Sequence, residues 1–295
     1  MATFESDNTA TTRLDPNNPP RPPFENTRDP RFFFASKGHM EALSRLLFLA
    51  EDRNMGMGLL TGEIGSGKTL LRTVLHARLS EETHLRVSIE NSLLCFDDLL
   101  LEIISQIRRE RLSAAGYPDR YSRLALFKRL LTEQVVSKNR HMVILLDEAQ
   151  LLTPGDLDAL KGLTNIASER QNYLTLILIG QPELREHMRQ LPQVDQRISL
   201  RFHLDALTPA EMGEYLEHRL AAAGYRGDFP FTEDALDLLY RASRGIPREI
   251  NRLCAIGLDH LLNNGLDQFS PTVVAAVVDD LKRHGALFEA GQDSL

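Results

Sequence analysis

The 295-residue sequence contains no tryptophan and only two cysteines, Cys95 and Cys254. Both cysteines lie in apolar, helix-like segments, and neither stands at metal-ligand spacing from other ligating residues. This pattern argues against a metal centre or a disulfide framework. It predicts two buried free thiols in a reducing compartment.

Long hydrophobic runs are also missing. The longest apolar stretches, such as YLTLILIG at 173–180, are far shorter than the roughly 20 residues that a membrane-spanning helix needs. The N-terminus is acidic and polar and lacks the apolar segment of a secretory signal peptide. We therefore expect a cytoplasmic protein without a membrane span.

An excess of positive charge is missing as well. The chain has 34 Lys and Arg residues against 41 Asp and Glu, which gives a formal net charge of −7. This balance argues against a surface coated with basic side chains for nucleic acid, although it leaves room for a local basic stripe. Hydrophobic residues make up 42% of the chain, so we expect a packed core in one large domain or two modest ones.

Short apolar runs alternate with longer amphipathic segments in most of the chain. Residues 1–23 are rich in Pro, Thr, Asn and Asp and predict a disordered tail. Residues 24–206 predict an α/β domain with a central, mainly parallel five-stranded sheet. The predicted strands are 55–63, 85–91, 142–149, 174–181 and 198–204.

After Leu207 the sequence carries helical patterns only. Thr208, Pro209 and Glu211 have the residue types and spacing of an N-cap, an N1 and an N3 position of a helix. Residues 207–285 therefore predict a small all-helical domain, and residues 286–295 a loose tail.

A nucleotide phosphate-binding loop is indicated by LLTGEIGSGKTLL at 59–71, in which Gly62 is followed after four residues by Gly67, Lys68 and Thr69. The loop joins a predicted strand to a predicted helix, so its N–H groups and the helix dipole can hold a β-phosphate. Lys68 can reach the β- and γ-phosphates, and the Thr69 hydroxyl can ligate Mg²⁺. The predicted nucleotide-binding residues of this loop are Gly62, Glu63, Ile64, Gly65, Ser66, Gly67, Lys68, Thr69 and Leu70.

Asp147 and Glu148 end another predicted strand, VILLDEAQ at 143–150. An acidic pair at the end of a buried strand is costly unless it meets a cation or a reacting water. Beside a phosphate loop, Asp147 is expected to hold Mg²⁺ and Glu148 to polarise the attacking water as general base. The pair favours hydrolysis over mere nucleotide sensing.

Further polar residues stand at element ends. Gln181 could sense the γ-phosphate or orient the water, or could be an ordinary turn residue. Arg197 and Arg201 could both be solvated charges beside the fifth strand, or Arg197 could reach a neighbouring subunit's nucleotide. Arg248 stands at a helix start, where a cation opposes the dipole, so we infer that it binds an anionic ligand.

Together these motifs resemble the AAA+ ATPases, and in particular the ATPase domain of the general secretion pathway protein A family. The resemblance covers residues 24–284 and includes the stretches LLTGEIGSGKT, LLDEAQLLTP, LTLILIGQPELRE, DQRISLRFHLDALTPAE and ASRGIPREINRLC. It implies that Gln181 is sensor 1, Arg197 the arginine finger and Arg248 sensor 2. It also implies that Asn91 is the polar switch that restrains Glu148, although Asn91 could equally be a simple strand cap.

The resemblance also implies a P-loop AAA+ fold with a helical lid, ATP and Mg²⁺ as cofactors, and a homo-oligomer with ATP at its subunit interfaces. The expected role is a motor or switch for a cell-envelope secretion, pilus or exopolysaccharide assembly system, at the inner membrane only through a partner. A well-known family member continues into a transmembrane segment and a peptidoglycan-binding domain, whereas this chain ends at Leu295. Similar domains serve DNA transposition, so an ATP-dependent DNA-binding regulator is the alternative, with 106–112 and 126–131 as candidate basic contacts.

Overall fold

The computed structural model describes residues 22–90, 94–166 and 171–284. Its contacts divide the chain into two compact units. Residues 35–205 form one unit, and residues 22–34 join residues 206–284 in the other. The candidate site residues at the phosphate loop and the acidic pair all belong to the first unit.

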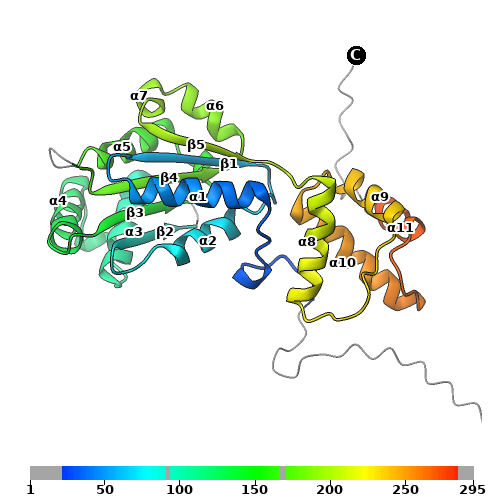
Figure 1. Ribbon diagram of the computed structural model, residues 1–295. Helices are drawn as coiled ribbons and strands as arrows, with labels where there is room; N and C mark the ends of the chain where they lie inside the picture. Colours follow the sequence, from blue (N-terminus) through cyan, green and yellow to red (C-terminus); the bar gives the residue numbers. More distant parts are fainter. Residues whose placement is uncertain (1–21, 91–93, 167–170, 285–295) are drawn as a thin grey trace, which may run out of the picture. The chain divides into compact units, whose positions relative to one another are not determined.

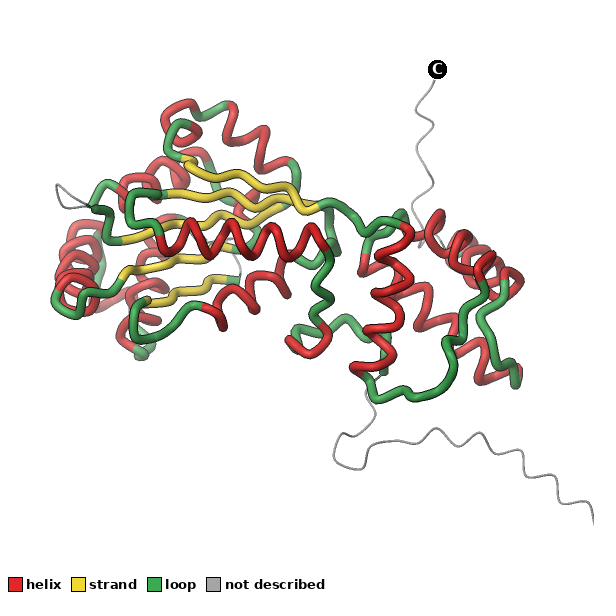
Figure 2. The backbone as a smooth tube through the Cα atoms, viewed as in Figure 1, coloured by secondary structure: helices red, strands yellow, loops and turns green. Residues whose placement is uncertain are grey.

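The first unit is built on a sheet, drawn in yellow in Figure 2. Its five strands follow the order β2-β3-β4-β1-β5, and every strand pair is parallel. This arrangement confirms the predicted α/β fold with a five-stranded sheet. Every residue of β1, β3 and β4 is buried, as expected for strands that are covered on both faces. The strands are β1 (Met57–Gly62), β2 (His84–Ile89), β3 (His141–Leu146), β4 (Leu174–Gly180) and β5 (Ile198–Leu204).

Helices cover both faces of the sheet (Figure 1). On one face, α1 and α2 pack against each other and against β1. The apolar side chains of α3, α4 and α5 form a single core with the strand side chains of the opposite face. The helices of this unit are α1 (Lys37–Glu51), α2 (Lys68–Arg78), α3 (Phe96–Arg108), α4 (Arg120–Leu131), α5 (Pro154–Thr164), α6 (Glu183–Arg189) and α7 (Pro192–Asp195), with a π-helical turn at Thr132–Val136 and 3-10 turns at Ala114–Gly116 and Ala149–Leu151.

The second unit contains the predicted helices, and the first of them begins with the predicted cap. The Glu211 N–H donates to Thr208 Oγ1 (3.3 Å), and the Thr208 N–H donates to Glu211 Oε2 (3.0 Å), which is a capping box. Its helices share one apolar core. They are α8 (Pro209–Ala222), α9 (Glu233–Ser243), α10 (Pro247–Asn264) and α11 (Pro271–Arg283).

The segment before α1 packs differently from what the sequence indicated. The sequence grouped residues 24–34 with the sheet domain, but Phe24 and Phe32 are buried in the helical unit, at 3% and 2% exposure. Arg219 of α8 holds this segment: its Nε donates to Pro23 O (2.6 Å), and its guanidinium lies 4.4 Å from the Phe32 ring centroid. An irregular segment has no hydrophobic period, so its packing partner cannot be read from the sequence.

The two cysteines differ from each other. Cys254 is fully buried, as predicted, and burial raises the pKa of its thiol. The expectation for Cys95 was wrong, because this residue is exposed at the N-cap of α3, where its Sγ lies 3.4 Å from Asp98 Oδ2. Among the residues that the structure describes, none of the helices combines the length and the apolar character needed to cross a membrane.

Candidate functional site

The glycine-rich loop joins the end of β1 to the start of α2. Gly65 and Gly67 have φ values of 84° and 101°, a region that L side chains rarely adopt. Space is restricted as well, because a Cβ on Gly67 would lie 2.6 Å from His39 Nε2 and one on Gly62 would lie 2.6 Å from Leu204 O. The loop can therefore keep this path only with glycine at these positions.

Polar groups inside the loop face one another. Lys68 is buried, and its Nζ donates to Gly62 O (2.7 Å) and Glu63 O (2.8 Å). The Ser66 hydroxyl is buried and has no hydrogen-bond partner among the described residues. A buried ammonium and a buried hydroxyl at a helix N-terminus form a cradle for an anion.

His39 of α1 forms a hydrogen bond with the backbone of this loop, and no sequence pattern indicated this contact. Its Nε2 lies 3.1 Å from Ser66 O and its Nδ1 2.7 Å from Ser36 Oγ. A carbonyl oxygen only accepts, so Nε2 carries the proton and Nδ1 accepts from the serine hydroxyl. The imidazole ring thereby holds the backbone carbonyl of Ser66 in place.

The end of β3 lies beside the start of α2. Thr69 Oγ1 donates to Asp147 Oδ2 (3.0 Å), so the two residues predicted to hold a metal ion are in direct contact. Asp147 is 3% exposed, and burial raises the pKa of its carboxyl, while Arg72 and Thr69 act in the opposite direction. A hydroxyl and a carboxylate side by side are hard oxygen ligands of the kind that Mg²⁺ takes.

Arg72 is a site residue that sequence reasoning missed. Its Nε lies 3.5 Å from Asp147 Oδ2, and its other nitrogens donate to Ser88 Oγ and Glu90 Oε1, both at 2.9 Å. The only available signal was its place one helical turn after Lys68, which puts both residues on the same face of α2. Arg72 thus joins the carboxylate of β3 to the end of β2.

Glu148 follows Asp147 in a backbone conformation that is rare for its type, with φ at 54°. Its Oε2 accepts from Gln150 Nε2 (2.6 Å) and lies 3.4 Å from Gln181 Nε2. The structure therefore brings Gln181, at the end of β4, to the carboxylate of Glu148. Gln150 is a second residue that sequence reasoning missed.

Four further predicted residues are Arg197, Arg201, Arg248 and Asn91. Arg197 is exposed between α7 and β5, with no side-chain hydrogen bond or ion pair to any described residue. Arg201 donates from Nη1 to Asp195 Oδ1 (2.8 Å). Arg248 is exposed at the start of α10 in the helical unit, and Asn91 lies outside the described residues.

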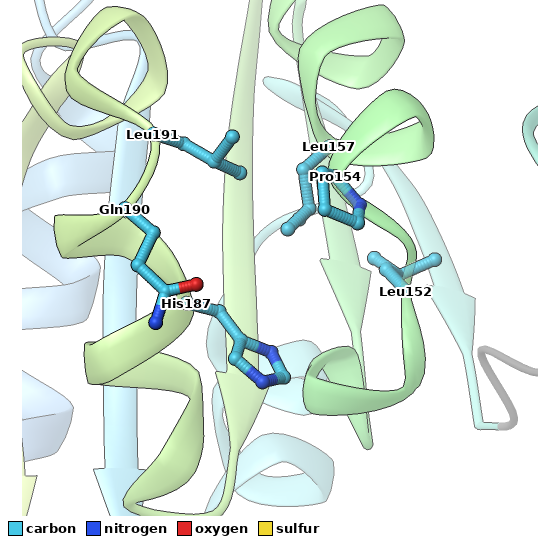
Figure 3. Close-up of a pocket in the computed structure, with 6 residues that line it drawn as sticks. All are labelled: Leu152, Pro154, Leu157, His187, Gln190 and Leu191. Carbon is cyan, nitrogen blue, oxygen red and sulfur yellow. The ribbon is translucent and has the colours of Figure 1, made fainter.

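A groove of about 240 Å³ lies between α5 and the helices α6 and α7 (Figure 3). It contains none of the residues discussed above for the phosphate loop or the acidic pair. Its lining is formed by Leu152, Pro154, Leu157, His187, Gln190 and Leu191.

Sequence comparisons identify two kinds of similarity. Residues 51–188 match the family model of the AAA domain. Over 238 residues, or 79% of this chain, the sequence is 37% identical to general secretion pathway protein A of Aeromonas hydrophila. The chain spans less than half of that relative, because the match covers 42% of its length.

Solved AAA+ structures share the fold. The ORC2 protein of Aeropyrum pernix, in its ADPNP–ADP complexes, superposes with a TM-score of 0.66 at 23% identity, covering 88% of this chain and 72% of that one. The RuvB Holliday junction branch migration motor of Thermotoga maritima gives 0.57 at 18% identity, covering 88% and 73%. These identities are too low to show more than a common fold. Residues 51–188 thus match an AAA domain within a chain of AAA+ fold, and this chain resembles general secretion pathway protein A over most of its own length.

Proposed function

We propose that this protein binds ATP with Mg²⁺ and hydrolyses it. The observation that carries the proposal is the contact between Thr69 and Asp147, with Glu148 next in the chain. This contact supports the proposal, because two oxygen groups of the kind that Mg²⁺ takes meet beside the glycine-rich loop, with a carboxylate that can act as base next in the chain. AAA+ relatives of the same fold have been solved as ADPNP–ADP complexes, which supports a nucleotide as the ligand.

The polar groups of the loop suit a nucleotide phosphate once the Lys68 side chain turns. Lys68 Nζ lies 2.7 Å from Gly62 O and needs only to turn from the loop carbonyls toward an entering phosphate. The unpartnered Ser66 hydroxyl and the N-terminal N–H groups of α2 supply further donors. When bound, Mg²⁺ would neutralise phosphate charge, held by Thr69, Asp147 and phosphate oxygens. One protein carboxylate is sufficient in such a site, because phosphates complete the coordination.

Glu148 is the proposed general base. Its carboxylate is half-buried and held at one oxygen by Gln150 and Gln181, so it can take a proton from an attacking water. Gln181 acts from the same contact, where it can orient that water or respond to the γ-phosphate.

Arg197 is the proposed trans arginine of a homo-oligomer. It is exposed, whereas Arg201 is already paired with Asp195 within its own chain. A guanidinium from a neighbouring subunit can stabilise the charge that develops during phosphoryl transfer. Arg248 is proposed to link the helical unit to the nucleotide state, and Asn91 to act as a switch on Glu148.

The assignment of Glu148 is tested by Glu148→Gln, with Lys68→Ala as comparison. We expect Glu148→Gln to bind ATP as the unaltered protein does while its turnover falls by roughly 100-fold or more, since a general base contributes about that factor. Lys68→Ala should lose binding. Fluorescent-nucleotide titration and phosphate release measure the two quantities, and a parallel loss of both in Glu148→Gln would contradict the role as base.

For the biological role we propose a motor or switch of a cell-envelope secretion or assembly system, at the membrane only through a partner protein. The support is the resemblance to general secretion pathway protein A, of which the chain spans 42%. The structure supplies one observation that weakens a DNA-binding role: three of the five basic side chains in the candidate segments 106–112 and 126–131 are paired with carboxylates. These pairs are Arg108 with Glu110 (2.9 Å), Arg109 with Glu81 (3.8 Å) and Arg129 with Glu133 (3.7 Å).

DNA binding measured with an ATP analogue at rising salt separates the two roles. The envelope role predicts no more than weak binding. Tight binding with a steep salt dependence would indicate several phosphate contacts and would favour the DNA-binding regulator instead.

A further inference from the structure

We propose that Gln150 is a positioning residue that fixes the carboxylate of Glu148 against the end of β4 and so sets the direction in which the base acts. The proposal rests on the hydrolytic role proposed above for Glu148. It adds a residue whose side chain acts on the base and not on the nucleotide.

Both ends of the Gln150 amide are engaged. Its Nε2 donates to Glu148 Oε2 (2.6 Å), and its Oε1 accepts from the backbone N–H of Gln181 (3.1 Å). The first partner can only accept and the second can only donate, so the side chain at position 150 must do both. A glutamate there would oppose the charge of Glu148, and an apolar side chain would leave both partners without this bond.

The backbone around Gly180 is shaped for this amide. A Cβ on Gly180 would lie 2.6 Å from Gln150 Oε1 and 2.9 Å from Leu184 Cδ2. Gly180 ends β4 without a positive φ, so its backbone conformation does not require glycine. The requirement is space for the side chains of Gln150, which comes nearest, and Leu184.

The consequence concerns the two oxygens of Glu148. Gln150 and Gln181 both approach Oε2, whereas Oε1 has no hydrogen bond from the described residues. The backbone at Glu148 is in a sparsely populated region, which persists where the surrounding contacts hold it. The Gln150 bond therefore leaves Oε1 available to an attacking water and ties the base to the strand end that carries Gln181.

The test is a set of variants at position 150 in the full chain, with ATP as substrate. Gln150→Met and Gln150→Glu keep the length of the side chain but remove the two-sided hydrogen bonding. We expect kcat to fall roughly 10- to 100-fold, because misplacing a catalytic group by about 1 Å costs up to that much. The KM and the affinity for an ATP analogue should stay near those of the unaltered protein. Gly180→Ala, which displaces the amide without altering it, should lower kcat in the same way.

A double-variant cycle with Glu148→Gln separates positioning from a merely structural role. Once the carboxylate is gone, Gln150→Met should cause little further loss in single-turnover rate, since it acts only through Glu148. Gln268→Met, at an exposed position of the helical unit, is the matched control and should leave the rate unchanged.

Two results would overturn the inference: an unchanged kcat in both position-150 variants, or an equal loss from Gln150→Met with and without Glu148. A Glu148→Gln protein of normal turnover would instead overturn the proposed function itself. Melting curves identify any variant that fails to fold, and Gln150→Glu then decides in place of Gln150→Met.

Discussion

Arg72 shows how much of the site depends on a side chain that no motif indicates. It lies between Asp147, at 3.5 Å, and Glu90, at 2.9 Å, and it is 3% exposed. Asp147 is buried, and its neighbour Glu148 adds negative charge that would push the pKa of Asp147 further up. Arg72 acts in the opposite direction on the pKa of Asp147 and favours the ionised carboxylate.

Replacing Arg72 should therefore destabilise the fold. Arg72→Met leaves a buried carboxylate without its cation, and we expect the free energy of unfolding to fall by roughly 3 kcal/mol. Urea denaturation followed by circular dichroism measures the change. Arg129→Met removes an exposed pair with Glu133 and should cost less than about 1 kcal/mol. Equal effects of the two changes would contradict the role given to Arg72.

At the scale of elements, the sequence predicted those features that depend on residues close together in the chain. The phosphate loop was predicted because glycine spacing acts within eight residues, and β5 matches its predicted bounds at 198–204. The strand predicted at 142–149 ends at Leu146, because the backbone leaves the sheet at Asp147 and turns to a positive φ at Glu148. His39, Arg72 and Gln150 could not be found in this way, since their partners are on other elements.

The start of β3 has a consequence for stability against pH. His141 is 2% exposed, and its Nε2 bonds to Thr175 Oγ1 at 2.8 Å. Burial, with smaller contributions from His84 and Arg53, lowers its pKa to about 4. In the unfolded chain the histidine side chain takes up a proton near pH 6.5, whereas in the folded chain it does so only near pH 4. The stabilisation from keeping His141 neutral is therefore complete above pH 6.5 and is lost as the pH falls toward 4.

We expect this histidine to account for up to about 3 kcal/mol of the stability lost between pH 6.5 and 4. His141→Gln can still donate to Thr175 and should reduce the change of stability with pH. Urea denaturation midpoints measured between pH 6.5 and 4 test this. His260→Gln, at a partly exposed position, serves as control. A profile for His141→Gln that parallels the unaltered protein would contradict this prediction.

At the scale of the whole molecule, the exposed Arg197 makes a prediction about mixtures of chains. If Arg197 completes the site of a neighbour, Arg197→Ala and Glu148→Gln proteins should each be inactive alone. A 1:1 mixture should recover about a quarter of normal ATPase activity, because that share of sites combines an intact base with a neighbour's intact arginine. Arg201→Ala, which loses only its pair with Asp195, should remain active. No recovery in the mixture would place the arginine within its own subunit.

The pairing of residues 22–34 with the helical unit affects the order in which the chain can fold. Pro23 and Arg219 are 196 positions apart, and the entire sheet unit lies between them in sequence. A ribosome releases the N-terminal parts of a chain first, so residues 35–205 can complete their core while Phe24 and Phe32 still lack a partner. The helical unit is then the last to fold. It can complete its core only after α8 has been synthesised and Arg219 can bind residues 22–34.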